Sequence, residues 1–206
     1  EYASGGWLHG RDMVSQGQIV QQVNASGADV LLVEVENVTG AVIEQCPTLA
    51  VIGSLRSNPV NIDVAAARAA GVTVLFTPGR NANAVAELAV CLMIDVLRSV
   101  SFSYRDMRVG LWGEKQDDPY LRYRGNELGS RTVGILGFGA VGQRVAKLLG
   151  GFGSDILAYD PYQEERVFAE LGARKVTLET LLSCSDVVTV HLPMNSETRN
   201  LLGSRE

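Results

Sequence analysis

The sequence has few of the residues that mark several protein classes. Three cysteines occur among 206 residues (Cys46, Cys91 and Cys184). Their spacing is not that of metal ligands, and their odd number does not suggest a disulfide framework. We predict free thiols, with Cys91 and Cys184 buried in apolar surroundings, no metal site, and a reducing, cytoplasmic setting. No apolar run reaches about 18 residues, so no membrane span is expected. The net charge of −5 is spread without long runs, which argues against a nucleic-acid partner.

The composition is that of a globular protein, with 46% hydrophobic and 20% charged residues, and the length allows two modest domains. Its first part alternates helix-like and strand-like segments, which predicts a parallel sheet with helices. Gly71 follows the third helix as a C-terminal cap. The expected helices are 15–26, 39–45 and 63–70, and the expected strands are 28–33, 49–53 and 72–76.

A long apolar segment, 84–100, predicts a helix that is buried on most sides. The more polar residues 101–131 predict a short helix over 102–109 and then an irregular segment. Trp112, Tyr120 and Tyr123 give this segment large apolar surfaces. Two interpretations stay open for them, namely contact with a second subunit and packing on the same chain.

Residues 133–142 read VGILGFGAVG and are the most informative part of the sequence. A short buried strand leads into Gly137, Gly139 and Gly142, in the order G-x-G-x-x-G. The first glycine permits the tight turn, the second lets the backbone approach a pyrophosphate, and the third lets the following helix pack closely on the strand. The helix over 141–149 points free N–H groups and a positive dipole end at the phosphates.

A second strand, 156–160, ends in Asp160, which lies 18 residues after Gly142. A carboxylate at this place accepts hydrogen bonds from a ribose 2′-hydroxyl and repels a 2′-phosphate, which favours NAD over NADP. The alternative is a glycine-rich turn in an ordinary βαβ unit that binds no ligand. The flanking strand, helix and acid favour the nucleotide site.

The remaining segments continue the α/β pattern, but both domains look incomplete. A helix over 163–171, a strand near 175–176, a helix over 180–184 and a strand over 186–190 follow. A dinucleotide domain has about six strands, and the N-terminal part opens on a helix. We therefore predict an α/β protein with two doubly wound parallel-sheet domains, residues 1–98 for substrate binding and 99–206 for NAD binding, and expect the chain to be a fragment of a longer protein.

Several further motifs make the chain resemble the D-isomer-specific 2-hydroxyacid dehydrogenase family, and within it the D-3-phosphoglycerate-dehydrogenase-like branch. They are Asn61-Ile62-Asp63 with Gly71-Val72-Thr73-Val74, Thr77-Pro78-Gly79-Arg80-Asn81 with Ala84-Val85-Ala86-Glu87, Glu127-Leu128, Tyr159-Asp160-Pro161, and His191-Leu192-Pro193 with Glu197-Thr198-Arg199-Asn200-Leu201. The resemblance covers roughly residues 29–206. It implies a flavodoxin-like substrate domain, a Rossmann NAD-binding domain, an active site in the cleft between them, and a homodimer.

The resemblance also implies roles for individual residues. It assigns the pyrophosphate to the glycine loop, the adenosine ribose to Asp160, and the nicotinamide side to Thr77 and Val85. The substrate carboxylate is assigned to the loop after the strand 49–53. The cofactor residues are Thr77, Val85, Gly137, Phe138, Gly139, Ala140, Val141, Gly142, Asp160, Pro161, His191, Leu192, Pro193 and Thr198, and the substrate residues are Arg56, Ser57, Asn58 and Arg80.

This chain departs from the glycine-rich G-x-G-x-D-N segment that many members carry at the substrate loop. Arg56 and Arg80 instead suggest an acid with a further anionic or polar group, such as a phosphorylated or polyhydroxylated one. Ordinary salt bridging is the alternative, and arginine suits both.

The catalytic residues cannot be assigned within the sequence. The family uses an arginine that grips the substrate, and a histidine acid–base held by a glutamate; the resemblance places all three beyond Glu206. His191 is not the catalytic acid in the family. We expect NAD-dependent hydride transfer at C2 of a 2-hydroxy or 2-oxo acid by the whole protein, with this fragment inactive alone. The alternatives are an NAD(H)-sensing regulatory protein similar to a co-repressor, and a degraded fragment without its own function.

Overall fold

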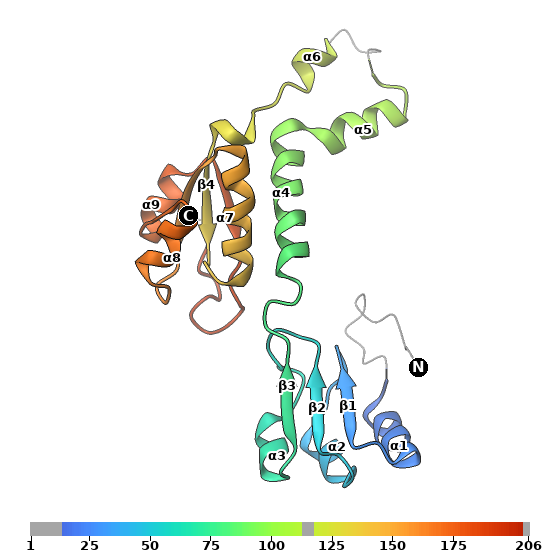
Figure 1. Ribbon diagram of the computed structural model, residues 1–206. Coiled ribbons are helices and arrows are strands. Elements are labelled where there is room, and N and C mark those ends of the chain that lie inside the picture. Colours follow the sequence, from blue (N-terminus) through green and yellow to red (C-terminus); the bar gives the residue numbers. More distant parts are fainter. Residues whose placement is uncertain (1–13, 113–117, 204–206) are drawn as a thin grey trace. The chain divides into compact units, whose positions relative to one another are not determined.

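The computed structural model describes residues 14–112 and 118–203, which fall into two compact units (Figure 1). Unit 1 extends to Arg80 and unit 2 begins at Asn81. Each unit contains one sheet of parallel strands with helices, so the predicted α/β class with parallel sheets is confirmed. The boundary of the units lies before the predicted one at residue 98, because the helix over 82–98 packs within unit 2.

Unit 1 forms a three-stranded sheet in the order β1-β2-β3, made of Val30–Val33, Val51–Ser54 and Thr73–Phe76. Its helices are α1 (Gln16–Ser26), α2 (Gly40–Glu44) and α3 (Val64–Ala69). The sequence sets the helix starts, because Ser15 closes a capping box on α1 and Asp63 caps α3 by accepting from the N–H of Ala66. The predicted strands and helices of this unit are all present.

One face of this sheet carries the core of unit 1. Val33 and Ile52 pack with Ile19 and Val23 of α1. On the opposite face, Leu32 is 67% exposed. Among the described residues of unit 1, helices therefore pack on one face of the sheet only, whereas the predicted double winding would place helices on both faces.

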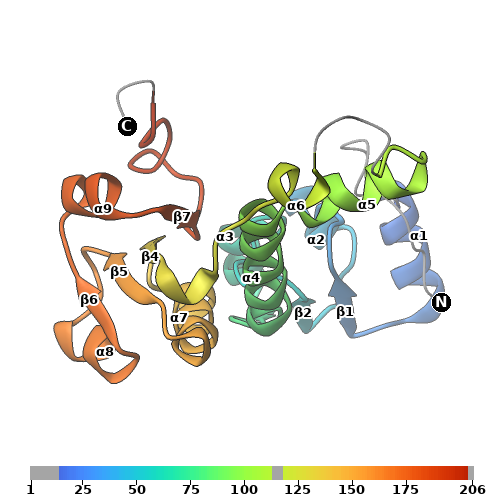
Figure 2. The same ribbon diagram turned by 90° about the horizontal axis from the view of Figure 1, so that it is seen from above.

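Unit 2 contains a four-stranded parallel sheet in the order β6-β5-β4-β7 (Figure 2). The strands are β4 (Thr132–Leu136), β5 (Asp155–Tyr159), β6 (Ala173–Lys175) and β7 (Val187–Val190). A short 3-10 turn, Leu128–Ser130, precedes β4, and the helices that follow the strands are α7 (Ala140–Phe152), α8 (Glu165–Glu170) and α9 (Leu178–Cys184). In its core the Phe138 ring stacks on Phe168, with centroids 4.5 Å apart. The chain reverses its winding beside β4, where such sheets bind ligands.

The two helices predicted over 84–100 and 102–109 are both present, but the break between them lies at Ser99, so the predicted end of the first helix at residue 100 is two residues too late. α4 (Ala82–Arg98) ends where Ser99 adopts a left-handed conformation with φ +53°, and α5 (Val100–Arg108) begins immediately. The Asp95 carboxylate stabilises this break, because it accepts from both the N–H and the hydroxyl of Ser101, at 2.6 and 2.7 Å. A further short helix, α6 (Pro119–Arg122), was not predicted.

α4 buries one stripe rather than most of its surface, which corrects a second expectation. Ala86, Val90 and Met93 join the core beside α7, whereas Leu88 and Val96 are exposed. Cys91 is exposed on this helix, and Cys184 is exposed at the last residue of α9, so the prediction that both are buried is wrong. Cys46 is buried, and all three thiols are free. No helix in the described part of the chain is long and apolar enough to cross a membrane.

Candidate nucleotide-binding site

The glycine loop at the end of β4 has the geometry that its three glycines predict. Gly137 adopts φ +94°, and a Cβ on it would lie 2.7 Å from the carbonyl oxygen of His191. A Cβ on Gly142 would collide with the carbonyl oxygen of Gly137. Gly139 differs, because a Cβ there would meet nothing within 4 Å. Two glycines are thus required by packing, and the third borders open space.

This open space lies at the start of α7. Gly139 is the N-cap of that helix and has no side chain to cap it. The first N–H groups of a helix have no partner within the helix, and the positive end of its dipole lies beside them. The loop therefore offers backbone donors, with no side chain in the way, to an anion such as a pyrophosphate. This arrangement fits the pyrophosphate of a dinucleotide.

Asp160 follows β5 and is bonded to the glycine loop. Its Oδ2 accepts from the N–H of Phe138 at 2.8 Å, and its Oδ1 accepts from the N–H of Tyr162 at 3.0 Å. Each carboxylate oxygen keeps a second lone pair, which can accept from a ribose hydroxyl. An open pocket of about 660 Å³ adjoins this residue, and it is lined by Tyr159, Asp160, Pro161, Lys175, Val176, Thr177, Leu178 and Glu179.

The segment after β7 lies against the same loop. Leu192 faces Gly137, since a Cβ on that glycine would lie 2.8 Å from Leu192 Cδ2. The N–H of His191 donates to the carbonyl of Leu136, and its ring Nε2 lies 2.9 Å from Thr189 Oγ1. Burial lowers the pKa of His191, which favours the neutral form of the imidazole.

Further along this segment a turn is fixed by Thr198 and Asn195. The hydroxyl of Thr198 donates to the carbonyl of Pro193, and Asn195 Oδ1 accepts from the N–H groups of Glu197 and Thr198. The predicted residues of unit 2 in the glycine loop, after β5 and after β7 thus gather at one edge of its sheet. Val85 lies separately, half-buried near the start of α4.

The predicted substrate residues belong to unit 1, after β2 and β3. The carbonyl of Arg56 accepts from the N–H of Thr77 at 3.0 Å, which joins the two segments. Arg80 pairs with Glu34 at 2.9 Å, whereas the Arg56 guanidinium has no partner among the described residues. Ser57 and Asn58 are exposed on the loop between β2 and α3.

Sequence reasoning missed the polar groups that support this loop. Asn61 is buried and donates from Nδ2 to the carbonyl of Glu36 at 2.8 Å, while Ser54 donates to Asn61 Oδ1 at 3.4 Å. The Ser54 hydroxyl also accepts from the N–H of Arg56 at 3.3 Å. The motif Asn61-Ile62-Asp63 was the only signal for this role, and it does not reveal the partners.

No group of three or more potential metal ligands occurs in the described residues.

Comparisons with known proteins agree with this geometry. Residues 90–206 match the family described as D-isomer specific 2-hydroxyacid dehydrogenase, NAD binding domain. A Bacillus subtilis protein named as a 2-hydroxyacid dehydrogenase, YoaD, is 43% identical over 91% of this chain and 54% of its own length. The hydroxypyruvate reductase of Thermotoga maritima is 37% identical over 84% of this chain and 54% of its own length. The D-3-phosphoglycerate dehydrogenase of Archaeoglobus fulgidus is 33% identical over 92% of this chain and 35% of its own length.

Solved structures give the same result. The pyruvate reductase of Chlamydomonas reinhardtii superposes with a TM-score of 0.76 at 28% identity, covering 93% of this chain and 55% of that one. The apo D-lactate dehydrogenase of Escherichia coli superposes with a TM-score of 0.71 at 27% identity, covering 91% and 65%. The chain spans about half, or less, of the curated relatives that it matches. It belongs to the D-isomer specific 2-hydroxyacid dehydrogenase family and carries residues of that family's NAD-binding domain.

Proposed function

We propose that the whole protein transfers a hydride between C4 of the nicotinamide of NAD and C2 of a D-2-hydroxy acid or its 2-oxo acid. In the oxidising direction the C2 hydrogen leaves with both electrons, and the hydroxyl proton goes to a base. The observation that carries the proposal is the Asp160 carboxylate, bonded to the N–H of Phe138 beside an uncapped helix start. The resemblance assigns no described residue of this chain to the base or to the arginine that grips the substrate.

The residues of unit 2 hold the cofactor in this proposal. The loop from Gly137 to Val141 binds the pyrophosphate, and Asp160 binds the adenosine ribose. Leu192, Pro193 and Thr198 border the nucleotide, and His191, whose ring lies beside Thr189, begins the same segment. Support comes from the open space at Gly139 and the contact of Leu192 with Gly137.

The substrate is proposed to be an acid with an additional phosphate or hydroxyl group. The relatives are named for phosphoglycerate, hydroxypyruvate and glyoxylate, so the family alone leaves the acid open. Arg56 has a free guanidinium among the described residues, whereas Arg80 is paired with Glu34. We therefore assign the additional anionic group to Arg56, and the acid carboxylate to the N–H groups around Ser57 and Asn58.

Two measurements test this function. Calorimetric titration of the 206-residue chain with NADH should detect binding, and the whole protein should reduce at least one of 3-phosphohydroxypyruvate, hydroxypyruvate, glyoxylate and pyruvate with NADH. Absence of NADH binding would overturn the cofactor site. Binding by the whole protein without turnover of any acid would favour the regulatory, NAD(H)-sensing alternative.

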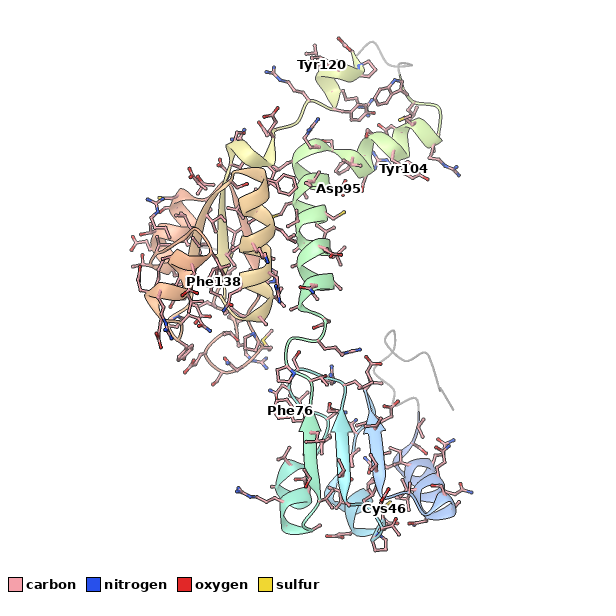
Figure 3. All side chains as sticks on the ribbon, in the orientation of Figure 1. Cys46, Phe76, Asp95, Tyr104, Tyr120 and Phe138 are labelled. Carbon is pink, nitrogen blue, oxygen red and sulfur yellow. The ribbon has the colours of Figure 1, made fainter. Side chains whose placement is uncertain are left out.

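We also propose that the protein is a homodimer. α5 and α6 expose large apolar side chains, including Tyr104 at 63% and Tyr120 at 79% (Figure 3). Phe102, Met107 and Leu121 add to this surface. Isolated exposed apolar residues need no explanation, but such a concentration marks an interface, and aromatic residues and methionine are enriched there.

Light scattering after size exclusion tests the dimer, with a monomer mass of 22.1 kDa for this chain. Tyr104→Ser combined with Met107→Ser should shift the mass toward the monomer. Val60→Ser, which changes an exposed apolar residue of unit 1, is the matched control. A monomeric unaltered chain would contradict the proposal.

We place the protein in the cytoplasm because its three thiols are free, and assign it neither a nucleic-acid nor a membrane partner.

A further inference from the structure

Tyr162 connects two loops at the end of the unit 2 sheet that carries the glycine loop. Its N–H donates to Asp160 Oδ1 at 3.0 Å, and its hydroxyl donates to Glu197 Oε2 at 2.5 Å. The two loops follow β5 and β7, which are the neighbours of β4 on either side. The link therefore joins the two loops, with the Asp160 carboxylate at the backbone N–H of Tyr162 and the Glu197 carboxylate at its hydroxyl, one tyrosine side chain apart.

Glu197 is fixed from its backbone as well. Its N–H donates to Asn195 Oδ1 at 2.9 Å, within the turn that Thr198 closes onto Pro193. The hydrogen bond to Glu197 raises the pKa of Tyr162, so this hydroxyl keeps its proton and remains a donor. The Glu197 carboxylate therefore has one side-chain partner among the described residues, the Tyr162 hydroxyl, on an exposed part of the surface.

The charges around this place are mainly negative. Asp160 and Glu179 line the adjoining pocket, and Glu197 adds a third carboxylate across the Tyr162 link. The ammonium of Lys175, which also lines the pocket, donates to the carbonyl of Gln163 at 2.6 Å. Arg199 is exposed on the turn that bears Glu197. It is the one arginine or lysine among the described residues that follow β7.

We propose that Glu197, held by Tyr162, is a second determinant of cofactor specificity, which acts with Asp160 against a phosphate on the 2′-oxygen of the adenosine ribose. The inference rests on the proposed NAD site and goes beyond it, because the preference for NAD over NADP then depends on two carboxylates. Glu197 is a specificity residue that repels the wrong ligand, and Tyr162 is a positioning residue. A unit charge several ångströms from a phosphate dianion in a partly hydrated site changes affinity about fivefold.

The test uses two nucleotides that differ only in the 2′-phosphate, adenosine 5′-monophosphate and adenosine 2′,5′-bisphosphate, titrated into the 206-residue chain by calorimetry. Glu197→Gln should lower the ratio of the bisphosphate Kd to the monophosphate Kd about fivefold. Tyr162→Phe releases the carboxylate and should lower the same ratio less. Both changes should shrink at high salt, because screening weakens the repulsion. A purely structural role would weaken both nucleotides alike and leave the ratio unchanged.

The control is Glu170→Gln, which removes one charge from the last residue of α8 and should not change the ratio. An unchanged ratio in both Glu197→Gln and Tyr162→Phe, with monophosphate binding intact, would overturn the inference and leave the NAD site standing. Failure of the unaltered chain to bind the monophosphate would overturn the NAD site and, with it, the inference. Tyr162→Phe keeps the question answerable if Glu197→Gln does not fold.

Discussion

The carboxylate of Asp160 accepts a hydrogen bond from the backbone N–H of Phe138, 2.8 Å away, and so ties the end of β5 to the glycine loop after β4. The same carboxylate is the proposed ribose acceptor. One residue therefore shapes the loop that receives the pyrophosphate and binds the adjoining sugar. Changes at Asp160 should affect both stability and cofactor affinity.

Asp160→Asn should lower the free energy of unfolding by about 1–2 kcal/mol, because one of the two backbone donors then faces an amide N–H₂ group. NADH affinity should fall as well, and discrimination against NADPH should weaken. Urea unfolding and calorimetric titration measure the two effects. Asp155→Asn at the start of β5 changes the same residue type at the opposite edge of the sheet and is the control. Unchanged stability and affinity in Asp160→Asn would contradict the assignment.

Gly137 and Gly139 should respond differently to alanine. Gly137→Ala should cost more than about 2 kcal/mol of unfolding free energy, because φ is +94° and the new Cβ would press on the carbonyl of His191. Gly139→Ala meets open space and should cost about 1 kcal/mol or less. It should nevertheless weaken NADH binding, because its methyl group enters the space proposed for the pyrophosphate.

Thermal unfolding and NADH titration of both variants separate packing from binding. A stable Gly137→Ala protein would contradict the packing role that the structure gives this residue. Full NADH affinity in Gly139→Ala would contradict the position assigned to the pyrophosphate.

The glycine loop and its strands were predictable because their signals are local. Gly137 has a positive φ that only glycine adopts easily, and the alternation of short apolar strands with helices is visible in the sequence. Asp160 was found for the same reason, since it ends the next strand. Its bond to Phe138 was not foreseen, because that contact depends on how the two strand ends meet.

The failures concern features that the local pattern of residue types does not reveal. The apolar composition of α4 does not reveal which of its faces finds a partner, so Cys91 was wrongly expected to be buried. The break at Ser99 depends on its left-handed backbone, which serine seldom adopts, and on Asp95 as a cap. The hydrogen bond between Tyr162 and Glu197 joins two loops that are 35 residues apart, and neither loop's sequence indicates that the other is its partner.

Asp106 makes the α5–α6 segment sensitive to acid. It is 2% exposed and accepts from the Tyr123 hydroxyl and from Arg122 Nη2, both at 2.8 Å. The hydrogen bond from Tyr123 lowers the pKa of Asp106 below its usual 3.8. A lowered pKa in the folded state means that this stabilisation is present above pH 3.8 and is lost as the pH falls through the folded value.

Asp106→Asn should therefore destabilise this segment at neutral pH, and its difference from the unaltered chain should shrink as the pH falls below about 4. Near-ultraviolet circular dichroism is a suitable signal, because Trp112 stacks on Tyr123 with ring centroids 5.1 Å apart. A difference that is constant from pH 7 to pH 3 would show that the charge of Asp106 does not stabilise the segment.

Arg56 and Arg80 should differ in their effects on the whole protein. Arg56→Ala should lower kcat/KM for a phosphorylated 2-oxo acid roughly tenfold more than for its unphosphorylated counterpart, because it removes one charge-assisted hydrogen bond of about 1.5 kcal/mol. Arg80→Ala should leave this selectivity unchanged, since Arg80 is paired with Glu34. It should also change stability by less than about 0.5 kcal/mol, because the pair is exposed at 50% and 41%. The reverse result, with selectivity lost in Arg80→Ala alone, would mean that Glu34 releases Arg80 to the substrate and that Arg56 has no part in recognition.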